Sequence, residues 1–264
     1  MHVTFLGTGT SHGIPMIGCD CAVCRSDNPR NKRLRPSIYV ECENQCLLVD
    51  ATPDLRTQAL RANIRRVDAV LMTHTHADHV LGLDDLRAFT ARNGRRMPIY
   101  GSPHSVETIR RVFPYACTET PAWAGLPSFE MHAIEPHQDF EVGGLKLRAL
   151  PLLHGRMTVY GFLFGREMAY VTDCNVVPPE VVGAIRGVTL LVLDALRHRP
   201  HPAHLTIDQA RAVAEQVKAS LTLFTHLCHE ADHEAVEQEL PPHVRVAYDG
   251  MKMEVSDDRV RQVA

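Results

Sequence analysis

The stretch His74-Thr75-His76-Ala77-Asp78-His79 decides which fold this chain of 264 residues adopts. It follows the apolar run Ala69–Met72, which is typical of a strand, and it precedes a helical pattern that starts near Val80. The first two histidines are two residues apart, so in an extended segment their side chains point the same way, whereas the aspartate and the last histidine begin the helix and point elsewhere. One short loop therefore offers ligands to two metal ions, and imidazole with carboxylate suits zinc, manganese or iron.

Helical patterns recur on both sides of this loop. Thr52 before Pro53 predicts the start of a helix that runs to about Asn63, and the capping box of Thr206 and Gln209 predicts the start of another. A third helix is predicted by apolar residues at helical spacing, namely Val80, Leu83, Leu86 and Phe89.

Short apolar runs of strand type alternate with these helices along the whole sequence. Asp249–Gly250, between Val244–Tyr248 and Met251–Val255, predicts a β-hairpin. Many strands with interspersed helices predict an α/β fold of two sheets packed face to face with helices outside, and no break in composition divides residues 1–264 into two domains. The other predicted strands are Val3–Leu6, Ser37–Val40, Cys46–Val49, Ile99–Tyr100, Leu145–Leu150, Gly161–Phe164, Met168–Val171, Leu190–Leu193 and Leu221–Phe224.

The composition is that of an ordinary globular protein, with 45% hydrophobic and 22% charged residues. A net charge of −3 argues against a protein that grips nucleic acid through a broadly basic surface. No apolar run is long enough to span a membrane, and no secretory pattern precedes Val3–Leu6, so we expect a cytoplasmic protein that does not bind membranes. In a reducing compartment, the tight spacing of Cys19, Cys21 and Cys24 favours a metal site over disulfides.

The His74–His79 loop resembles the H-x-H-x-D-H signature of the metallo-β-lactamase fold, a four-layer αββα sandwich. Later strand ends carry His154, Asp173 and His226 in the order that this superfamily uses. The resemblance implies that His74, His76 and His154 hold one metal, that Asp78, His79 and His226 hold a second, and that Asp173 bridges both. It also implies that Asp50, at another strand end, holds the ligand loop by hydrogen bonds.

The cysteine cluster narrows the resemblance to one group within the superfamily. A C-x-C-x-x-C pattern at Cys19, Cys21 and Cys24, with His229 three residues after His226, resembles the cyclic phosphodiesterases of bacterial phosphonate breakdown. That resemblance implies a small structural zinc-binding loop near residues 18–25. Three sulfurs and one nitrogen complete a tetrahedral site, which has no open position for a substrate.

A histidine-rich segment before the Thr206 helix supplies the remaining catalytic candidate. In the related enzymes a histidine that is not a ligand precedes this helix, and His204 matches it, with His201 as the alternative and His198 a distant third. The implied role is general acid, while Asp78 counts as catalytic as well as a ligand. Two metals about 3.5–4 Å apart can activate a bridging water for attack on phosphorus. We therefore expect hydrolysis of a small, cyclic phosphodiester.

Other functions of the superfamily fit less well. A β-lactamase would carry a secretory signal, a glyoxalase-type thioesterase a further C-terminal domain, a tRNA-processing nuclease a basic arm, and a flavin-linked oxidoreductase a second domain. A non-enzymatic scaffold would not need a full ligand set. The choice between zinc and manganese stays open, as does a homodimer. The candidates for gripping a terminal phosphate are Arg92, Arg95, Arg96, Arg110 and Arg111.

Overall fold

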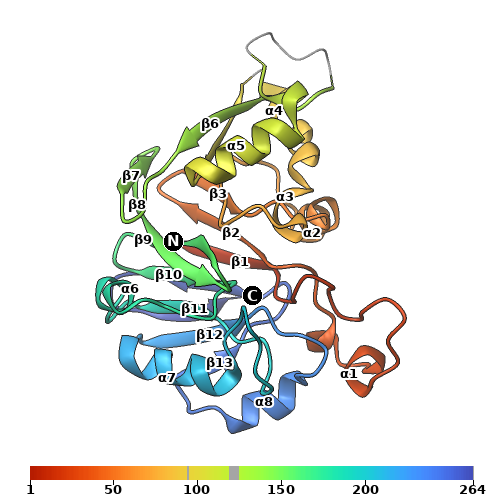
Figure 1. The fold of residues 1–264 in the computed structure, drawn as a ribbon, viewed down its shortest axis with the longest axis vertical. Helices are drawn as coiled ribbons and strands as arrows, with labels where there is room; N and C mark the ends of the chain where they lie inside the picture. Colours follow the sequence, from red (N-terminus) through yellow and green to blue (C-terminus); the bar gives the residue numbers. More distant parts are fainter. Residues whose placement is uncertain (94, 119–124, 264) are drawn as a thin grey trace.

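Two β-sheets packed face to face form the centre of the computed structural model, which describes residues 1–93, 95–118 and 125–263 (Figure 1). The first sheet has the order β15 (Val260–Val263), β14 (Lys252–Val255), β1 (His2–Gly7), β2 (Ser37–Cys42), β3 (Gln45–Val49), β4 (Ala69–Leu71), β5 (Met97–Gly101), β6 (Phe129–Ala133). The second has the order β13 (Val244–Val246), β12 (Leu221–Thr225), β11 (Leu190–Asp194), β10 (Met168–Val171), β9 (Met157–Phe164), β8 (Leu145–His154), β7 (Asp139–Val142).

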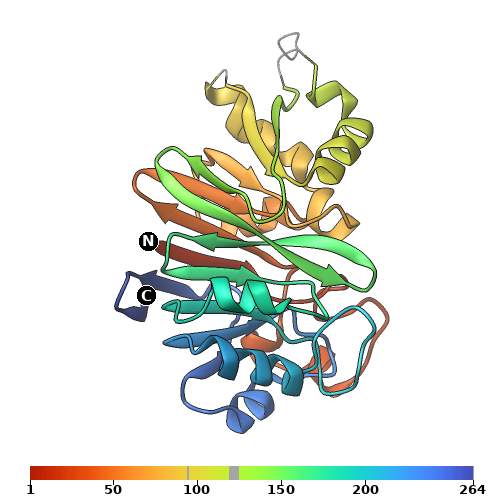
Figure 2. The ribbon, with the colours of Figure 1, turned by 60° about the vertical axis from the view of Figure 1, so that its left-hand side comes forward.

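Helices cover the outer face of each sheet, which gives the predicted four layers (Figures 1 and 2). Between the sheets, side chains such as Phe5, Phe162 and Tyr170 are buried in one apolar cluster. The first sheet is covered by α2 (Leu55–Arg61), α3 (Ala77–Val80), α4 (Arg87–Asn93), α5 (Pro103–Val112) and the 3-10 turns Leu83–Leu86 and Pro114–Ala116. The second is covered by α6 (Pro179–Ala184), α7 (Ile207–Val217) and α8 (His233–Glu239), while α1 (Ala22–Arg25) and the turn Pro29–Asn31 lie on a separate loop.

Parallel pairing brings the candidate ligands to one edge of the sandwich. Strands β3 to β6 are parallel in the first sheet, and β10 to β13 are parallel in the second. Their carboxyl ends are therefore followed by loops on a shared side, where ligand sites of α/β proteins commonly lie. Asp50 follows β3, His74 follows β4, Asp173 follows β10 and His226 follows β12.

The predicted hairpin around Asp249–Gly250 is wrong. Strand β13 pairs with β12 in the second sheet, whereas β14 pairs with β1 in the first, so this turn crosses between the sheets. The Asp249 carboxylate fixes the crossing, because it accepts hydrogen bonds from the backbone N–H groups of Thr8 and Leu34 at 2.8 and 2.7 Å. A turn motif cannot distinguish a hairpin from a crossing when the two strands have different partners.

Two helices differ from their predicted bounds. The capping box at Thr206 is confirmed, but α2 begins at Leu55, because Pro53 and Asp54 form a preceding turn that the bond from Leu55 N–H to Thr52 O closes. The predicted helix from Val80 is divided into α3, a 3-10 turn and α4. Gly82 explains the division, since its N–H bonds to Ala51 O and a Cβ there would lie 1.9 Å from Thr52 O.

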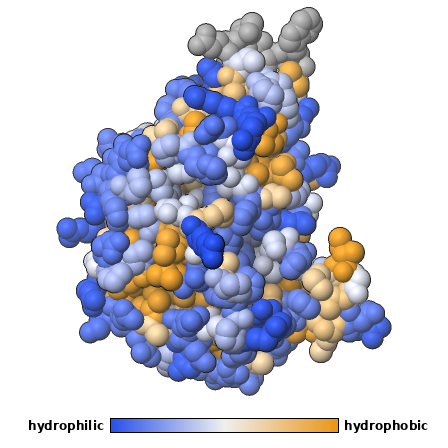
Figure 3. Space-filling view, viewed as in Figure 1, coloured by the Kyte–Doolittle hydropathy of each residue, from blue (hydrophilic) through white to orange (hydrophobic). Residues whose placement is uncertain are grey.

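The surface in Figure 3 is mostly hydrophilic, with apolar side chains gathered in small, separate areas. Within the described residues, no helix is both long and apolar enough to cross a lipid bilayer.

Candidate metal centre

Three histidines from both sheets face a common point. His74 and His76 come from the loop after β4, and His154 ends β8, with one nitrogen of each ring within 4.8 Å of the others. His154 Nδ1 donates to Ala203 O at 2.8 Å, which turns Nε2 toward the shared point. Burial, reinforced by the charge of His79, holds the pKa of His74 well below its usual range, so this ring is neutral and keeps a free lone pair.

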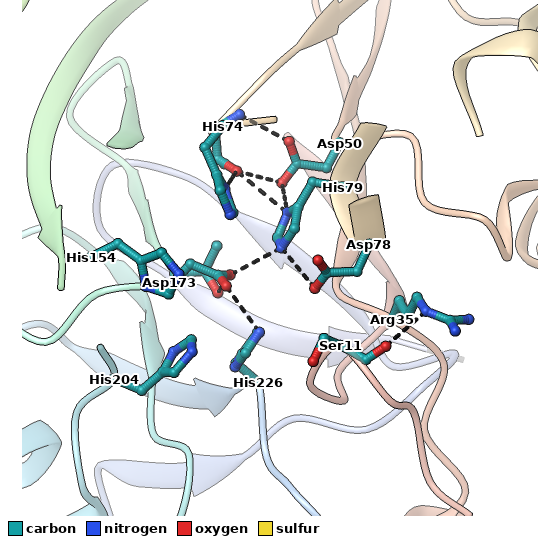
Figure 4. Close-up of polar contacts among 12 residues, drawn as sticks. Ser11, Arg35, Asp50, His74, Asp78, His79, His154, Asp173, His204 and His226 are labelled. Atoms are coloured by element: carbon teal, nitrogen blue, oxygen red, sulfur yellow. Dashed lines mark hydrogen bonds and ion pairs between the residues drawn. The ribbon is translucent and has the colours of Figure 1, made fainter. Parts of the chain in front are cut away.

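A second group lies next to the first and contains two carboxylates and two imidazoles (Figure 4). His79 Nε2 is 3.3 Å from Asp78 Oδ2 and 3.4 Å from Asp173 Oδ2, while His226 Nε2 is 3.1 Å from Asp173 Oδ1. Ligand atoms of Asp173 and His154 also lie within 4.8 Å of each other, so Asp173 stands between the two groups.

The donor atoms of both groups fit divalent metal ions. The buried Nε2 atoms of His74, His79 and His226 make no hydrogen bond of acceptable geometry, which is costly unless another partner binds them. Burial alone would lower the pKa of His226, but the carboxylate of Asp173 outweighs it and raises this pKa to about 9. The second group therefore favours positive charge, which a divalent cation supplies more compactly than protons do.

Asp50 holds the ligand loop, as expected. It is fully buried and accepts hydrogen bonds from Thr73 N–H at 2.9 Å, the Thr73 hydroxyl at 2.8 Å and His79 Nδ1 at 2.7 Å. A carboxylate on Nδ1 fixes both the tautomer and the orientation of a histidine that binds metal through Nε2.

Left-handed backbone occurs at three residues of this site. Asp50, Asp173 and His226 have φ angles of 61°, 53° and 63°, a region that residues other than glycine rarely adopt. Each residue lies one or two positions after a strand, so the chain turns sharply there and aims its side chain across the strand ends. Strained conformations of this kind gather at functional sites.

His204 lies against both groups of candidate ligands. Its ring centroid is 4.7 Å from that of His154 and 4.6 Å from that of His226, and the side chain is buried. His201 lies beside His204, with 4.9 Å between the two ring centroids, and its Nδ1 accepts a hydrogen bond from Ala203 N–H. His198 lies near the surface, 3.6 Å from Glu239.

Asp194 also belongs to the site, although no sequence motif singled it out. It is fully buried at the end of β11 and accepts hydrogen bonds from His204 Nδ1 at 3.1 Å and Cys174 N–H at 3.0 Å. Its other oxygen is 3.6 Å from His226 Nδ1. The available signal was its place at the carboxyl end of an apolar strand, the position that also carries Asp173 and His226.

The cysteine cluster forms a separate group with His229. Cys19 Sγ and Cys21 Sγ lie 3.3 and 3.4 Å from His229 Nδ1, and all four ligand atoms, including Cys24 Sγ, lie within 4.8 Å of one another. The N–H of Cys24, followed by His229, lowers the pKa of the Cys21 thiol to about 6. Thiolate and imidazole donors in a closed set are typical of structural zinc.

The arginines suggested for phosphate binding are not placed at this centre. Arg95 and Arg96 precede β5 and line a surface hollow with Arg66 and Glu130, at the amino edge of the first sheet, opposite the ligands. Arg110 and Arg111 are in the last turn of α5. The side chain of Arg92 is outside the described residues.

Two curated proteins resemble the chain over part of their own length. The octanoyltransferase of Porphyromonas gingivalis is 36% identical over 264 residues, which covers 99% of the chain and 53% of that protein. The ribonuclease Z of Bradyrhizobium diazoefficiens is 30% identical over 168 residues, which covers 61% of the chain and 49% of that protein. The chain thus spans about half the length of these relatives.

A family and a solved structure match more completely. The family model described as the beta-lactamase superfamily domain matches residues 45–227. The crystal structure of a diphosphatase from the PhnP family aligns with a TM-score of 0.89 and 42% identity, covering 97% of the chain and 98% of that structure. These two matches show that the chain belongs to the β-lactamase superfamily, as a metallo-β-lactamase-fold hydrolase related to the PhnP family.

Proposed function

We propose that the chain hydrolyses a small phosphodiester, cyclic esters included, at a centre of two divalent metal ions. One observation carries the proposal: Asp173 belongs to the second group of ligand atoms and lies within 4.8 Å of His154 of the first, and the buried pair of His204 and Asp194 stands beside them. A pair of cations suits a phosphoryl group, whose reaction concentrates negative charge on several oxygens. The similarity to a PhnP-family diphosphatase supports a phosphorus centre as the point of attack.

The proposed metals are held by the two groups described above. His74, His76 and His154 would hold one ion, and Asp78, His79 and His226 the other, with Asp173 shared. When bound, such ions act as Lewis acids that acidify water and neutralise phosphoryl oxygens. The ligands accept zinc or manganese, whereas the cysteine cluster would take a third ion, a structural zinc.

The chain's own residues account for the proton that the leaving group needs. His204 Nδ1 is bonded to Asp194, so Nε2 is the nitrogen left to face a substrate. The carboxylate prevents the ring from turning and stabilises a positive charge on it during the reaction. A positioned general acid contributes roughly 10²–10⁴-fold in rate. Asp50, acting through His79, keeps the ligand loop in place.

The test is a substrate panel assayed with metal-reconstituted protein. The panel contains cyclic phosphodiesters, linear phosphodiesters, a nucleoside diphosphate ester, a short RNA with a 3′ extension and an octanoyl thioester. We expect turnover of the phosphorus esters and none of the thioester. Turnover of the thioester alone would contradict the proposal and favour acyl transfer, while selective cleavage of the RNA would favour a nuclease, the second candidate raised by the ribonuclease Z match.

Replacement of the proposed acid refines the test. His204→Ala should keep its metal content and lose roughly 10²–10⁴-fold turnover on a phosphodiester with an alkyl leaving group. The loss should be much smaller with a nitrophenyl leaving group, which departs without a proton. Equal losses on the two substrates would mean that His204 binds substrate, and loss of metal would mean that it is a ligand.

A further inference from the structure

Backbone hydrogen bonds hold the segment that carries His204 near its two ends, and one of them, from Leu205 N–H to Cys174 O at 2.8 Å, lies directly beside His204. Leu196 N–H donates to Leu205 O, and Ile207 N–H donates to Arg197 O, both at 3.0 Å. The residues between these anchors form a loop, and Ala203 O in that loop accepts the hydrogen bond from His154. Asp194 holds the His204 ring itself, and the rest of the loop sets where the backbone places that ring.

Glu230 contacts two cations of this loop at once. Arg197 Nη1 donates to its Oε1, and Arg199 donates through Nη2 to Oε1 at 2.8 Å and through Nε to Oε2 at 3.3 Å. Arg197 Nε also donates to Arg199 O at 3.2 Å, which ties the two arginines together. Removal of the carboxylate would leave two like charges on neighbouring residues without their shared anion.

The segment that carries Glu230 also carries a candidate ligand of the catalytic centre and one of the cysteine cluster. His226 belongs to the second group, and His229 belongs to the cysteine cluster, one residue before Glu230. Cys228 N–H donates to Leu196 O at 3.0 Å, so the two segments lie side by side. The cysteine cluster thereby fixes the place of Glu230, and Glu230 fixes the arginines of the loop.

We infer that Glu230 is a positioning residue, which anchors the loop through Arg197 and Arg199 so that His204 delivers its proton to the leaving group. The inference rests on the proposed function, because it concerns the acid of that reaction. It also gives the cysteine cluster a second task besides stability, since this cluster is the fixed point from which the loop is held.

The solvent exposure of these three side chains sets how much the loss of Glu230 should reduce turnover. The side chain of Arg197 is 15% exposed, that of Glu230 is 34% exposed and that of Arg199 is 67% exposed. Exposed ion pairs are worth about 0.2–1 kcal/mol each, up to about fivefold in an equilibrium. For two pairs we expect a loss of about 3- to 10-fold in proton delivery, and backbone bonds maintain the remainder.

The experiment compares Glu230→Gln with Glu254→Gln in the metal-loaded protein. Glu254 is a matched control, because it pairs with Arg261 on β14 and β15 and is 37% exposed. Glu230→Gln should lose about 3- to 10-fold in kcat on the alkyl ester and less than twofold on the nitrophenyl ester, with unchanged metal content. Hydrogen exchange of residues 197–206 should quicken. The control should change neither measurement.

A second variant keeps the inference testable if Glu230→Gln folds poorly. Arg199→Gln changes an exposed side chain and should produce the same selective loss of kcat on the alkyl ester. The double variant with both substitutions should lose no more kcat than Glu230→Gln alone. Equal losses on both esters, or unchanged exchange with full turnover, would overturn the role of Glu230. If His204→Ala itself lacks the selective loss, the proposed acid fails instead, which distinguishes the two outcomes.

Discussion

Asp194→Asn tests whether the buried carboxylate at the end of β11 controls His204. The substitution keeps the shape of the side chain but removes its charge. The Asp194 carboxylate now accepts hydrogen bonds from His204 Nδ1 and Cys174 N–H, at 3.1 and 3.0 Å. Both bonds end on the same oxygen, Oδ2, so an asparagine that keeps its oxygen there accepts both without a charge, and one that turns its NH₂ group there loses both.

The magnitude follows from the charge-assisted bond to His204, which the neutral amide weakens or removes. Hydrogen bonds to charged groups contribute about 1.5–3 kcal/mol, and each 1.36 kcal/mol of barrier is tenfold in rate. If the whole loss falls on the step that uses His204, kcat on an alkyl phosphodiester should fall about 10- to 150-fold. On a nitrophenyl ester kcat should fall less than about threefold, because that leaving group needs little protonation.

The assay measures kcat for both esters and the metal content of the wild-type and Asp194→Asn proteins. Asp194 Oδ1 lies 3.6 Å from His226 Nδ1, so metal content shows whether the variant acts through this ligand instead. Retained metal with selective loss supports the reasoning. Full turnover of the alkyl ester by a folded variant would refute it.

Three further outcomes are expected. Asp173→Ala should abolish turnover and lower the catalytic metal content, measured by elemental analysis, because the carboxylate belongs to the second ligand group and lies within 4.8 Å of His154 of the first. A folded variant with wild-type turnover would exclude the proposed shared role. Cys21→Ser should lower the midpoint of thermal unfolding by roughly 5 °C or more, while the variant that is still folded keeps its turnover of the nitrophenyl ester. An unchanged midpoint would argue against a structural zinc. Burial, and after it the charge of Arg33, lowers the pKa of His233 from 6.5 to about 4. The unfolded chain therefore binds this proton more tightly than the folded chain does, and stability falls as the pH falls from 6.5 toward 4. His233→Asn should reduce this change in the free energy of unfolding, which amounts to about 3 kcal/mol, as measured by urea unfolding at pH 4.5 and 7. If the difference between the two pH values is unchanged in the variant, other groups cause it.

The arrangement of the site was largely predictable from the resemblance, whose signature puts candidate ligands at the ends of strands. In the structure His154, Asp173 and His226 lie beside the His74–His79 loop, while their role as metal ligands stays a prediction. Asp194 was missed, since an aspartate after an apolar run is more often a turn residue, and its partner is ten residues away.

The errors in the fold arose where a local pattern depends on distant partners. The turn at Asp249–Gly250 has the chemistry of a hairpin, but contacts with Thr8 and Leu34 direct the following strand into the other sheet. The helix from Val80 has regular apolar spacing, yet the close approach of Gly82 to Thr52 interrupts it. Neither contact can be deduced from the residues near the turn or the helix.

The left-handed backbone at Asp50, Asp173 and His226 affects how mutational scans of this protein should be interpreted. Alanine in that conformation costs roughly 1–2 kcal/mol, whereas asparagine adopts it more readily. An alanine scan would therefore overstate the contribution of these side chains, because part of each measured loss would come from the main chain. Asparagine replacements separate the two contributions. They are also the better choice for an inactive protein that retains its architecture and captures an uncleaved substrate for crystallography.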